Sequence, residues 1–324
     1  MSELDLTFPC MGCEFRLMIG DPVRSGTSSA ADAAERARRW LEACDERLSR
    51  FRPDSELVAL NDDPSPVVSC RPLLLSAVQA AIRAAALTGG LVDATLLGEI
   101  EAAGYRDSLA GAVPVPLAQA LPDTPVRRPA GARTGSRWRE IHVDRAAGTV
   151  SRPPGLRIDS GGVVKGMAAD VVARTLDGHS RFVVDAAGDL AIGGVDARAV
   201  PYEVAVEHPL TGEHVHNVRV GEGGIATSGL NSRMWRRADG SIAHHLLDPA
   251  TGLPAWTGLL MVTAVGPSAF EAETLAKWAL LSGPGGARRI LERHGGLSVH
   301  DDGDVELHGP LRARSSVSVW RAAA

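Results

Sequence analysis

Aromatic side chains are scarce in this chain of 324 residues, because Phe, Trp and Tyr together make up 4% of it. The core must therefore be built largely from Ala, Val and Leu. The 35 glycines and 20 prolines predict many turns and close backbone approaches, which suit a protein that encloses a ligand in loops.

Clusters of basic residues are also missing, and the formal net charge is −5. Nucleic acid is therefore not an expected partner, since phosphate neutralisation requires clustered Lys and Arg. No apolar stretch approaches the roughly twenty residues that cross a bilayer, so we expect no transmembrane segment. The first eight residues contain two acids and no basic residue, which is unlike a signal peptide, and we expect a cytoplasmic protein.

Cysteine is limited to four residues, two of which, Cys10 and Cys13, form a C-x-x-C. A zinc site would need a second such pair or a spaced His pair, and neither accompanies it. We therefore interpret the cysteines as small apolar residues of strands and helices.

The order of periodic segments predicts an α+β fold with helices packed on mixed sheets. Between residues 110 and 137 no period is visible, so we expect an irregular excursion there. Two lobes of a single domain spanning 1–324 could divide near 108–137. The expected helices are 29–51, 72–87, 167–176 and a last one at 270–282, ended by Gly283; the expected strands are 138–143, 149–150, 182–185, 202–206 and 218–220.

Two turns carry residues suited to catalysis or anion binding. Glycines 161 and 162, with Lys165, lie between a strand and a helix start, where backbone N–H groups can approach a phosphate. The segment is not a Walker A loop, and a Gly-Gly turn with one Lys can also be merely a tight turn. His245 and Asp248 precede a Pro-x-x-Gly turn and are suited to a general base with an orienting carboxylate, or to a turn cap. Of His244 and His245, at most one can face a site if this is a strand.

A third segment opens the expected last helix. Glu273 and Lys277 are four residues apart on one helix face, which favours a surface ion pair, or alternatively a phosphate or metal site.

Taken in order, these segments resemble the ApbE-like FAD:protein FMN transferases over nearly the whole chain. The matching stretches are Met11-Gly12-Cys13, Ser49 to Asn61, Asp93-Ala94-Thr95 with Gly104-Tyr105, Gly161 to Asp170, Ala187-Gly188-Asp189, Thr227-Ser228-Gly229 and His245 to Pro254. The resemblance implies largely antiparallel sheets in a two-lobed, T-fold-like architecture, with FAD between the lobes. It implies transfer of the FMN moiety of FAD to a Ser or Thr hydroxyl of an acceptor protein, with release of AMP.

The resemblance also implies roles for individual residues. His245 would take the hydroxyl proton, and Asp248 would hold the turn or the imidazole. The flavin would lie near Met11 and the 55–61 segment, and the pyrophosphate near Lys165 and the glycines. Residues expected to contact FAD are Met11, Ser55, Glu56, Asn61, Asp93, Thr95, Tyr105, Gly161, Gly162, Lys165, Asp170, Gly188, Asp189, Thr227, Ser228, Gly229, His245 and Lys277.

Magnesium is the cation that the resemblance implies, held by Glu273 and Gly162. The family pattern in the last helix is Asp-Ala-Leu-x-Thr, and this chain has Glu273 and Lys277 at the Asp and Thr positions. Glutamate can bind a hard cation, whereas a protonated lysine cannot. Our hypothesis is that the Lys277 ammonium lies where the cation would be; Cys13 for Thr and Ala187 for Gly are milder departures.

Two other activities fit the same motifs. An FAD pyrophosphatase would use water as the acceptor and give FMN and AMP, and a flavin carrier would bind FAD without turnover. No Asp-x-Ser/Thr-Gly-Ala-Thr target segment occurs in the chain, so we expect the acceptor to be another protein. The sequence names neither the acceptor nor the oligomeric state.

Overall fold

The computed structural model describes residues 3–313 and is organised around one eight-stranded sheet. Neighbouring strands are antiparallel throughout. In spatial order the strands are β1 (Leu4–Cys10), β2 (Cys13–Ile19), β6 (Phe182–Asp185), β7 (Asp189–Gly193), β10 (Gly223–Gly229), β15 (Leu259–Gly266), β16 (Gly296–His300) and β17 (Val305–His308).

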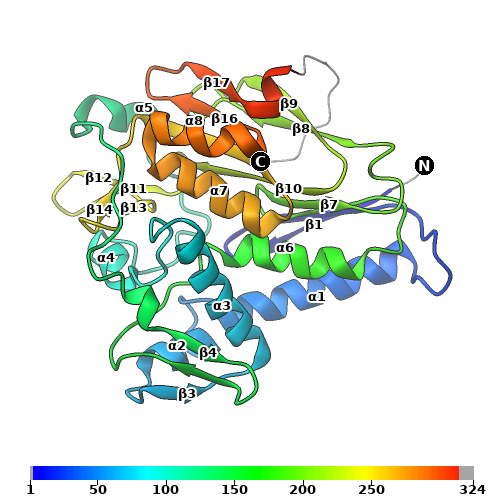
Figure 1. Ribbon diagram of the computed structural model, residues 1–324, viewed down its shortest axis with the longest axis horizontal. Helices are drawn as coiled ribbons and strands as arrows, with labels where there is room; N and C mark the ends of the chain where they lie inside the picture. Colours follow the sequence, from blue (N-terminus) through cyan, green and yellow to red (C-terminus); the bar gives the residue numbers. More distant parts are fainter. Residues whose placement is uncertain (1–2, 314–324) are drawn as a thin grey trace.

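Both faces of the sheet are covered. A row of four helices crosses one face (Figure 1): α1 (Ala30–Leu48), α6 (Val164–Thr175), α7 (Ala269–Leu281) and α8 (Gly283–His294). Apolar residues of the hairpin β8 (Tyr202–Glu207) and β9 (His214–Val220) pack with those of the sheet in a separate cluster. Every residue of β6 and β7 is buried, as expected for strands covered on both sides.

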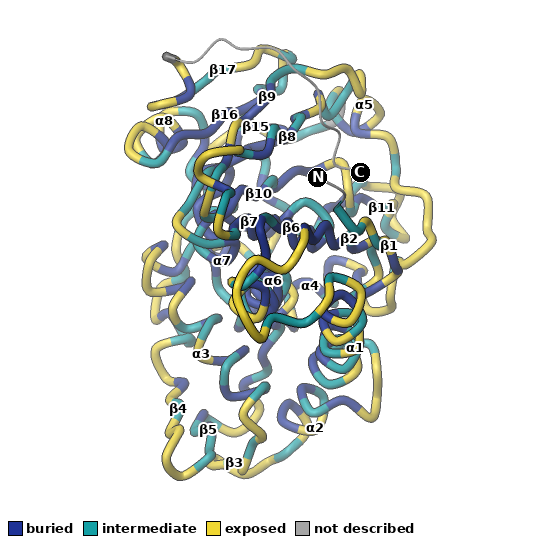
Figure 2. The backbone as a smooth tube through the Cα atoms, turned by 90° about the vertical axis from the view of Figure 1, so that its right-hand side faces the viewer, coloured by how far each residue is buried: buried dark blue, intermediate teal, exposed yellow. Residues whose placement is uncertain are grey.

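A smaller lobe packs against the helical layer. It consists of α2 (Glu56–Asp62), α3 (Pro72–Leu87) and a three-stranded sheet of β3 (Val67–Ser69), β5 (Thr149–Ser151) and β4 (His142–Asp144). Helix α3 contacts both α1 and α6. Figure 2 shows buried backbone concentrated in the large sheet and the inner sides of its helices, with exposed loops around the small lobe.

The remaining elements are short. They are α4 (Leu97–Ala102), α5 (Leu117–Ala120), the 3-10 turns Leu121–Asp123, Arg137–Glu140 and Gly309–Ala313, and two small hairpins, β11 (Met234–Arg236) with β12 (Ile242–His244) and β13 (Leu247–Asp248) with β14 (Leu253–Pro254). Within residues 3–313, no helix combines the length and apolarity required to span a membrane.

The structure confirms the expected α+β class and most of the helices. Helix α3 has the predicted bounds, because Pro72 starts it and the Gly89-Gly90 pair follows it. Two expectations were wrong. Helix α7 is not the last, since α8 begins at Gly283 itself; and the strand expected at 138–143 is a 3-10 turn followed by β4.

The stretch from 110 to 137 contains the short helix α5 and the 3-10 turn Leu121–Asp123 and is otherwise irregular, as predicted. It is tied to the second half of the chain. Backbone N–H groups of Val115, Arg128 and Ala130 donate to carbonyls of Met234, Trp256 and Leu281. The division of the chain into lobes at this stretch therefore remains a prediction, as does a single domain spanning 1–324, whose ends at 1–2 and 314–324 lie outside the described residues.

Candidate functional site

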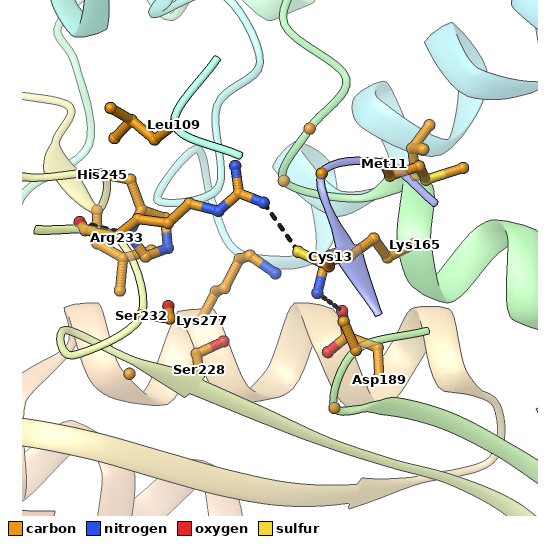
Figure 3. Close-up of a pocket in the computed structure, with 18 of the residues that line it drawn as sticks. Met11, Cys13, Leu109, Lys165, Asp189, Ser228, Ser232, Arg233, His245 and Lys277 are labelled. Atoms are coloured by element: carbon orange, nitrogen blue, oxygen red, sulfur yellow. Dashed lines mark hydrogen bonds and ion pairs between the residues drawn. The ribbon is translucent and has the colours of Figure 1, made fainter. Parts of the chain in front are cut away.

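A cavity of about 1190 Å³ is lined by segments of both lobes. This volume exceeds the roughly 300–1,000 Å³ of pockets for drug-sized ligands, so the cavity suits a larger molecule. Figure 3 shows side chains from several distant segments converging on it, among them Met11, Lys165, Asp189, Arg233, His245 and Lys277.

The β1–β2 turn forms one edge of the cavity. Met11 and Gly12 both have positive φ, 52° and 69°, which is the geometry of a two-residue hairpin turn between the paired Cys10 and Cys13. This pairing gives the C-x-x-C spacing a structural reason. The Cys10 thiol donates to the Leu41 carbonyl, whereas Cys13 accepts from Arg233 at 3.1 Å.

The start of α6 supplies a fixed positive charge. Gly161 and Gly162 precede the helix, and Lys165 lies in its first turn, where the helix dipole also favours an anion. The Lys165 ammonium is 2.5 Å from the Asp189 carboxylate. Burial opposes its charge, but Asp189 and Glu273 outweigh burial, so the pKa of Lys165 is raised and the ammonium stays protonated.

Asp185 and Asp189 flank the β6–β7 turn. Burial, reinforced by Asp189, raises the pKa of Asp185 to about 6, although the Gly188 N–H donates to it. Ala187 in this turn has φ 56°, a left-handed conformation that is unfavourable for alanine. Asp185 is therefore a titratable carboxyl beside the Lys165–Asp189 ion pair.

His245 lines the cavity directly after β12. Its Nδ1 lies 3.4 Å from the Arg233 carbonyl. A carbonyl can only accept, so this contact places the proton on Nδ1 and leaves the Nε2 lone pair free. Burial, and then His244, Arg233 and Lys277, hold the pKa of His245 well below its usual value, so the imidazole is neutral at pH 7.

His244 faces away from the cavity. It is fully buried, its ring meets Trp256 edge-on at 4.7 Å, and its Nδ1 accepts from Leu246 N. The expectation that only one of the two histidines faces a site is confirmed by this alternation.

Asp248 lies beneath the turn rather than in the cavity lining. Its Oδ1 accepts from the backbone N–H groups of Gly131 at 2.9 Å and Ala250 at 3.1 Å. Of the two roles expected for Asp248, the geometry supports holding the turn, because the imidazole of His245 is held by the Arg233 carbonyl.

Helix α7 brings Glu273 and Lys277 to the base of the cavity. The Lys277 ammonium donates to Glu273 Oε1 at 2.8 Å, and the Gly166 N–H donates to Oε2 at 3.0 Å. Lys277 lines the cavity, whereas Glu273 is fully buried behind it. Burial, with Asp189 adding to it, raises the pKa of Glu273 to about 7, against the opposing effect of both lysines.

Three aromatic rings line another part of the wall. Tyr105 packs against Phe51 at 5.5 Å and Trp235 at 5.3 Å between centroids, in a chain where aromatics are scarce. The Arg50 guanidinium lies 4.5 Å from the Tyr105 ring centroid, and Arg233 donates to the Tyr105 hydroxyl. This wall combines flat apolar surface with cations.

The cavity brings together most of the residues expected to contact FAD. These are Met11, Asp93, Tyr105, Gly161, Gly162, Lys165, Gly188, Asp189, Thr227, Ser228, Gly229, His245 and Lys277. The Asp93 Oδ1 accepts from Thr95, while its buried Oδ2 has no partner among the described residues.

Five expected residues lie outside the lining and bond to the protein instead. Ser55 caps α2 by accepting from Val58 N, and Glu56 pairs with Arg47. The Asn61 side chain bonds the backbone of Ile158 in both directions. The last two are Thr95, which donates to Asp93, and Asp170, which caps α7 by accepting from Ala269 N and Phe270 N. The aromatic side chains of the cavity lining are Phe51, Tyr105 and Trp235, whereas Ser55, Glu56 and Asn61 lie outside it.

Sequence reasoning missed three contributions to the cavity. Arg233, Asp185 and the aromatic pair Phe51 and Trp235 were not singled out. A charged residue at the end of an apolar strand could have indicated Asp185, but nothing local distinguishes one arginine among 34 basic residues.

Known proteins resemble the chain in sequence and fold. A sequence model of the ApbE family matches residues 11–300. FAD:protein FMN transferase from Salmonella typhimurium is 30% identical over 276 residues, 82% of this chain and 75% of the relative. The enzyme of that name from Escherichia coli K12 is 29% identical over 280 residues, 84% of this chain and 76% of the relative.

Solved structures agree on the fold. The ApbE protein of Thermotoga maritima superposes with a TM-score of 0.78 at 23% identity, covering 96% of this chain and 99% of that one. The flavin transferase ApbE of Vibrio cholerae gives 0.71 at 23% identity, covering 96% and 99%.

Proposed function

Because the chain belongs to the ApbE family, we propose that it is an FAD:protein FMN transferase, which moves the FMN moiety of FAD to a Ser or Thr hydroxyl of an acceptor protein and releases AMP. The structural observation that carries this function is His245, with its Nδ1 on the Arg233 carbonyl and its Nε2 lone pair free, in one cavity with Lys165, Arg233 and Lys277. A base that is free to accept a proton beside a group of cations suits attack of a hydroxyl on the phosphoanhydride of the FAD pyrophosphate.

The cavity offers different surroundings to the two ends of FAD. We place the isoalloxazine against Phe51, Tyr105 and Trp235, because flat rings stack on aromatic walls. We place the pyrophosphate at the start of α6, near Lys165 and Gly162, where the helix dipole and the ammonium both favour anions.

The transfer then needs one bond to form and one to break. The acceptor hydroxyl oxygen bonds to the FMN phosphorus, and its proton passes to His245 Nε2. The bond from this phosphorus to the bridging oxygen breaks, and AMP leaves with the electron pair. Lys165, Arg233 and Lys277 neutralise the charge on the phosphoryl oxygens, since positioning and electrostatic stabilisation dominate phosphoryl transfer.

The residues expected to hold magnesium do not fit it as they stand. Both carboxylate oxygens of Glu273 already accept hydrogen bonds, and one of these comes from the Lys277 ammonium. Across residues 3–313 no group of three or more His, Cys, Asp or Glu side chains is arranged to hold a metal.

The two alternative activities separate by their products. A pyrophosphatase releases AMP without labelling protein, and a carrier releases no AMP. A direct test incubates the protein with FAD and a synthetic peptide carrying the Asp-x-Thr-Gly-Ala-Thr segment, and follows AMP and peptide-bound flavin.

We expect flavin on one threonine of the peptide and an equal amount of AMP. His245→Ala should slow the formation of both products by about 10²–10⁴-fold, while His142→Ala, at an exposed position in the small lobe, should leave both rates unchanged. AMP without labelled peptide, or flavin bound without AMP, would replace the transferase assignment. Another chain as acceptor, and a cytoplasmic location, remain predictions from sequence.

A further inference from the structure

The chain contains only two lysines among its 34 basic residues, Lys165 and Lys277, and both line the cavity. Everywhere else arginine supplies the positive charge. The two ammonium groups are held in the same manner, each by one carboxylate: Lys165 by Asp189 at 2.5 Å and Lys277 by Glu273 at 2.8 Å. A compact ammonium acts as a point charge toward phosphate, in contrast to the planar fork of arginine.

Lys277 occupies the space between the two residues expected to hold magnesium. Its ammonium contacts Glu273, and its Cε lies 3.9 Å from the position that a Cβ on Gly162 would take. Figure 3 shows the Lys277 side chain reaching the cavity near Ser228 and Arg233. An ammonium has no lone pair, so it cannot join an oxygen shell of the kind that magnesium requires.

The anchoring of Lys277 fixes its charge in advance of substrate. Glu273 is fully buried, and its second oxygen is held by the Gly166 N–H at the α6–α7 crossing. Gly166 permits this crossing, because a Cβ there would come within 2.8 Å of the Glu273 carboxylate. A charge fixed in this way stabilises a developing anion without reorganisation at the moment of reaction.

We infer that the Lys277 ammonium supplies the positive charge that a divalent cation would otherwise supply at the FAD pyrophosphate, so that this chain binds and cleaves FAD without magnesium. This inference rests on the proposed function for its catalytic part only. FAD affinity reports on Lys277 even if the chain transfers nothing.

The test compares FAD affinity, by quenching of flavin fluorescence, in excess EDTA and in millimolar magnesium. The affinity of the wild-type protein for FAD should be equal in the two buffers. Lys277→Met should weaken binding by about ten- to hundredfold in both, as expected for loss of a charged hydrogen bond. Lys277→Thr should lose the same affinity in EDTA and regain it with magnesium, because the hydroxyl frees Glu273 for a cation.

A double variant distinguishes loss of the Lys277 charge from misfolding. Lys277→Met alone leaves a buried carboxylate without its cation, which destabilises proteins. The double variant Glu273→Gln, Lys277→Met removes both charges and should fold, yet bind FAD as weakly as the single variant. Circular dichroism and thermal unfolding establish that each protein is folded.

Transfer measured in the same two buffers separates the inference from the proposed function. Wild-type labelling that is lost in EDTA and restored by magnesium would overturn the inference and leave the transferase assignment intact. Wild-type affinity that rises tenfold with magnesium, or the double variant binding like wild type, would overturn it as well. Absence of any transfer, with affinity still dependent on Lys277, would reject only the transferase assignment.

Discussion

The imidazole of His245 is held through its Nδ1 by the backbone carbonyl of Arg233, 3.4 Å away. The guanidinium of the same residue contacts Cys13 and Tyr105. One residue therefore orients the proposed base with its main chain and contributes a cation with its side chain. The proton acceptor in the proposed transfer is therefore Nε2, because the carbonyl fixes the tautomer.

Replacing His245 by Ala should lower kcat for transfer by about 10²–10⁴-fold, the usual contribution of a general base. FAD affinity should change by less than about threefold, since the proposed role of His245 is proton transfer rather than binding. Labelling rates and fluorescence titration measure the two effects. A variant that keeps a tenth or more of wild-type kcat would assign the base to another residue.

Replacing Asp248 by Ala should act on stability. Its Oδ1 accepts from the backbone N–H groups of Gly131 and Ala250. Ala250 N keeps its bond to the Gly131 carbonyl, but Gly131 N would lose its acceptor, at about 1–3 kcal/mol of unfolding free energy. Denaturant unfolding measures this loss. Once folded, the variant should retain much more transfer activity than His245→Ala, and equal losses of kcat would place Asp248 in the chemistry.

His244 predicts acid sensitivity of the folded state. Burial lowers its pKa to about 3, so between pH 3 and 6.5 the unfolded chain binds a proton that the folded chain does not. Stability is therefore lost as the pH falls below 6.5, by about 1.4 kcal/mol per pH unit from this residue.

His244→Asn provides the comparison for this prediction, because the amide oxygen can still accept from Leu246 N. Its unfolding free energy should fall less steeply with acid than that of wild type, while Asp185 and Glu273 contribute equally to both proteins. Parallel curves between pH 6.5 and 4.5 would show that His244 is protonated in the folded protein.

Ala187→Gly should stabilise the protein by about 1 kcal/mol, because alanine is strained at φ 56° and glycine is not. The neighbouring Gly188, at φ 91°, is the matched control, and Gly188→Ala should destabilise it. Thermal unfolding shows whether the melting temperature rises for Ala187→Gly and falls for Gly188→Ala. Two shifts in the same direction would show that cavity packing rather than backbone strain governs this turn.

Local signals predicted the helices that have clear ends. Pro72 and the Gly89-Gly90 pair bound α3 as expected. The same reasoning failed at Gly283-Pro284-Gly285-Gly286, where glycines indicated a stop. Gly283, at φ 67°, does follow the end of α7, but α8 begins at the same residue with Pro284 in its first turn. Gly286 is required there because a Cβ would lie 2.2 Å from Ser282 Cβ. This close approach at the junction of two helices has no signature in local periodicity.

Site residues that belong to sequence motifs in turns could be predicted, whereas isolated side chains that enter the cavity could not. Lys165, Asp189 and His245 stand in motifs, and the cavity unites them. Arg233 reaches the site only because the β11–β12 hairpin folds back beside Cys13, a residue 220 positions away in the sequence. Conversely, Asn61 and Asp170 belong to motifs but bond backbone groups, so a motif position does not distinguish a ligand contact from a structural one.

Because both lysines line the cavity, reagents that modify primary amines have few targets on this protein. Apart from the α-amino group, every primary amine of the chain lies at the proposed FAD site. An amine-directed acylating reagent should therefore modify, besides the α-amino group, only these two lysines, at a pH high enough to deprotonate them, and bound FAD should protect them. Lysine acetylation would act in the same place, which makes this chain open to inactivation by a single class of modification.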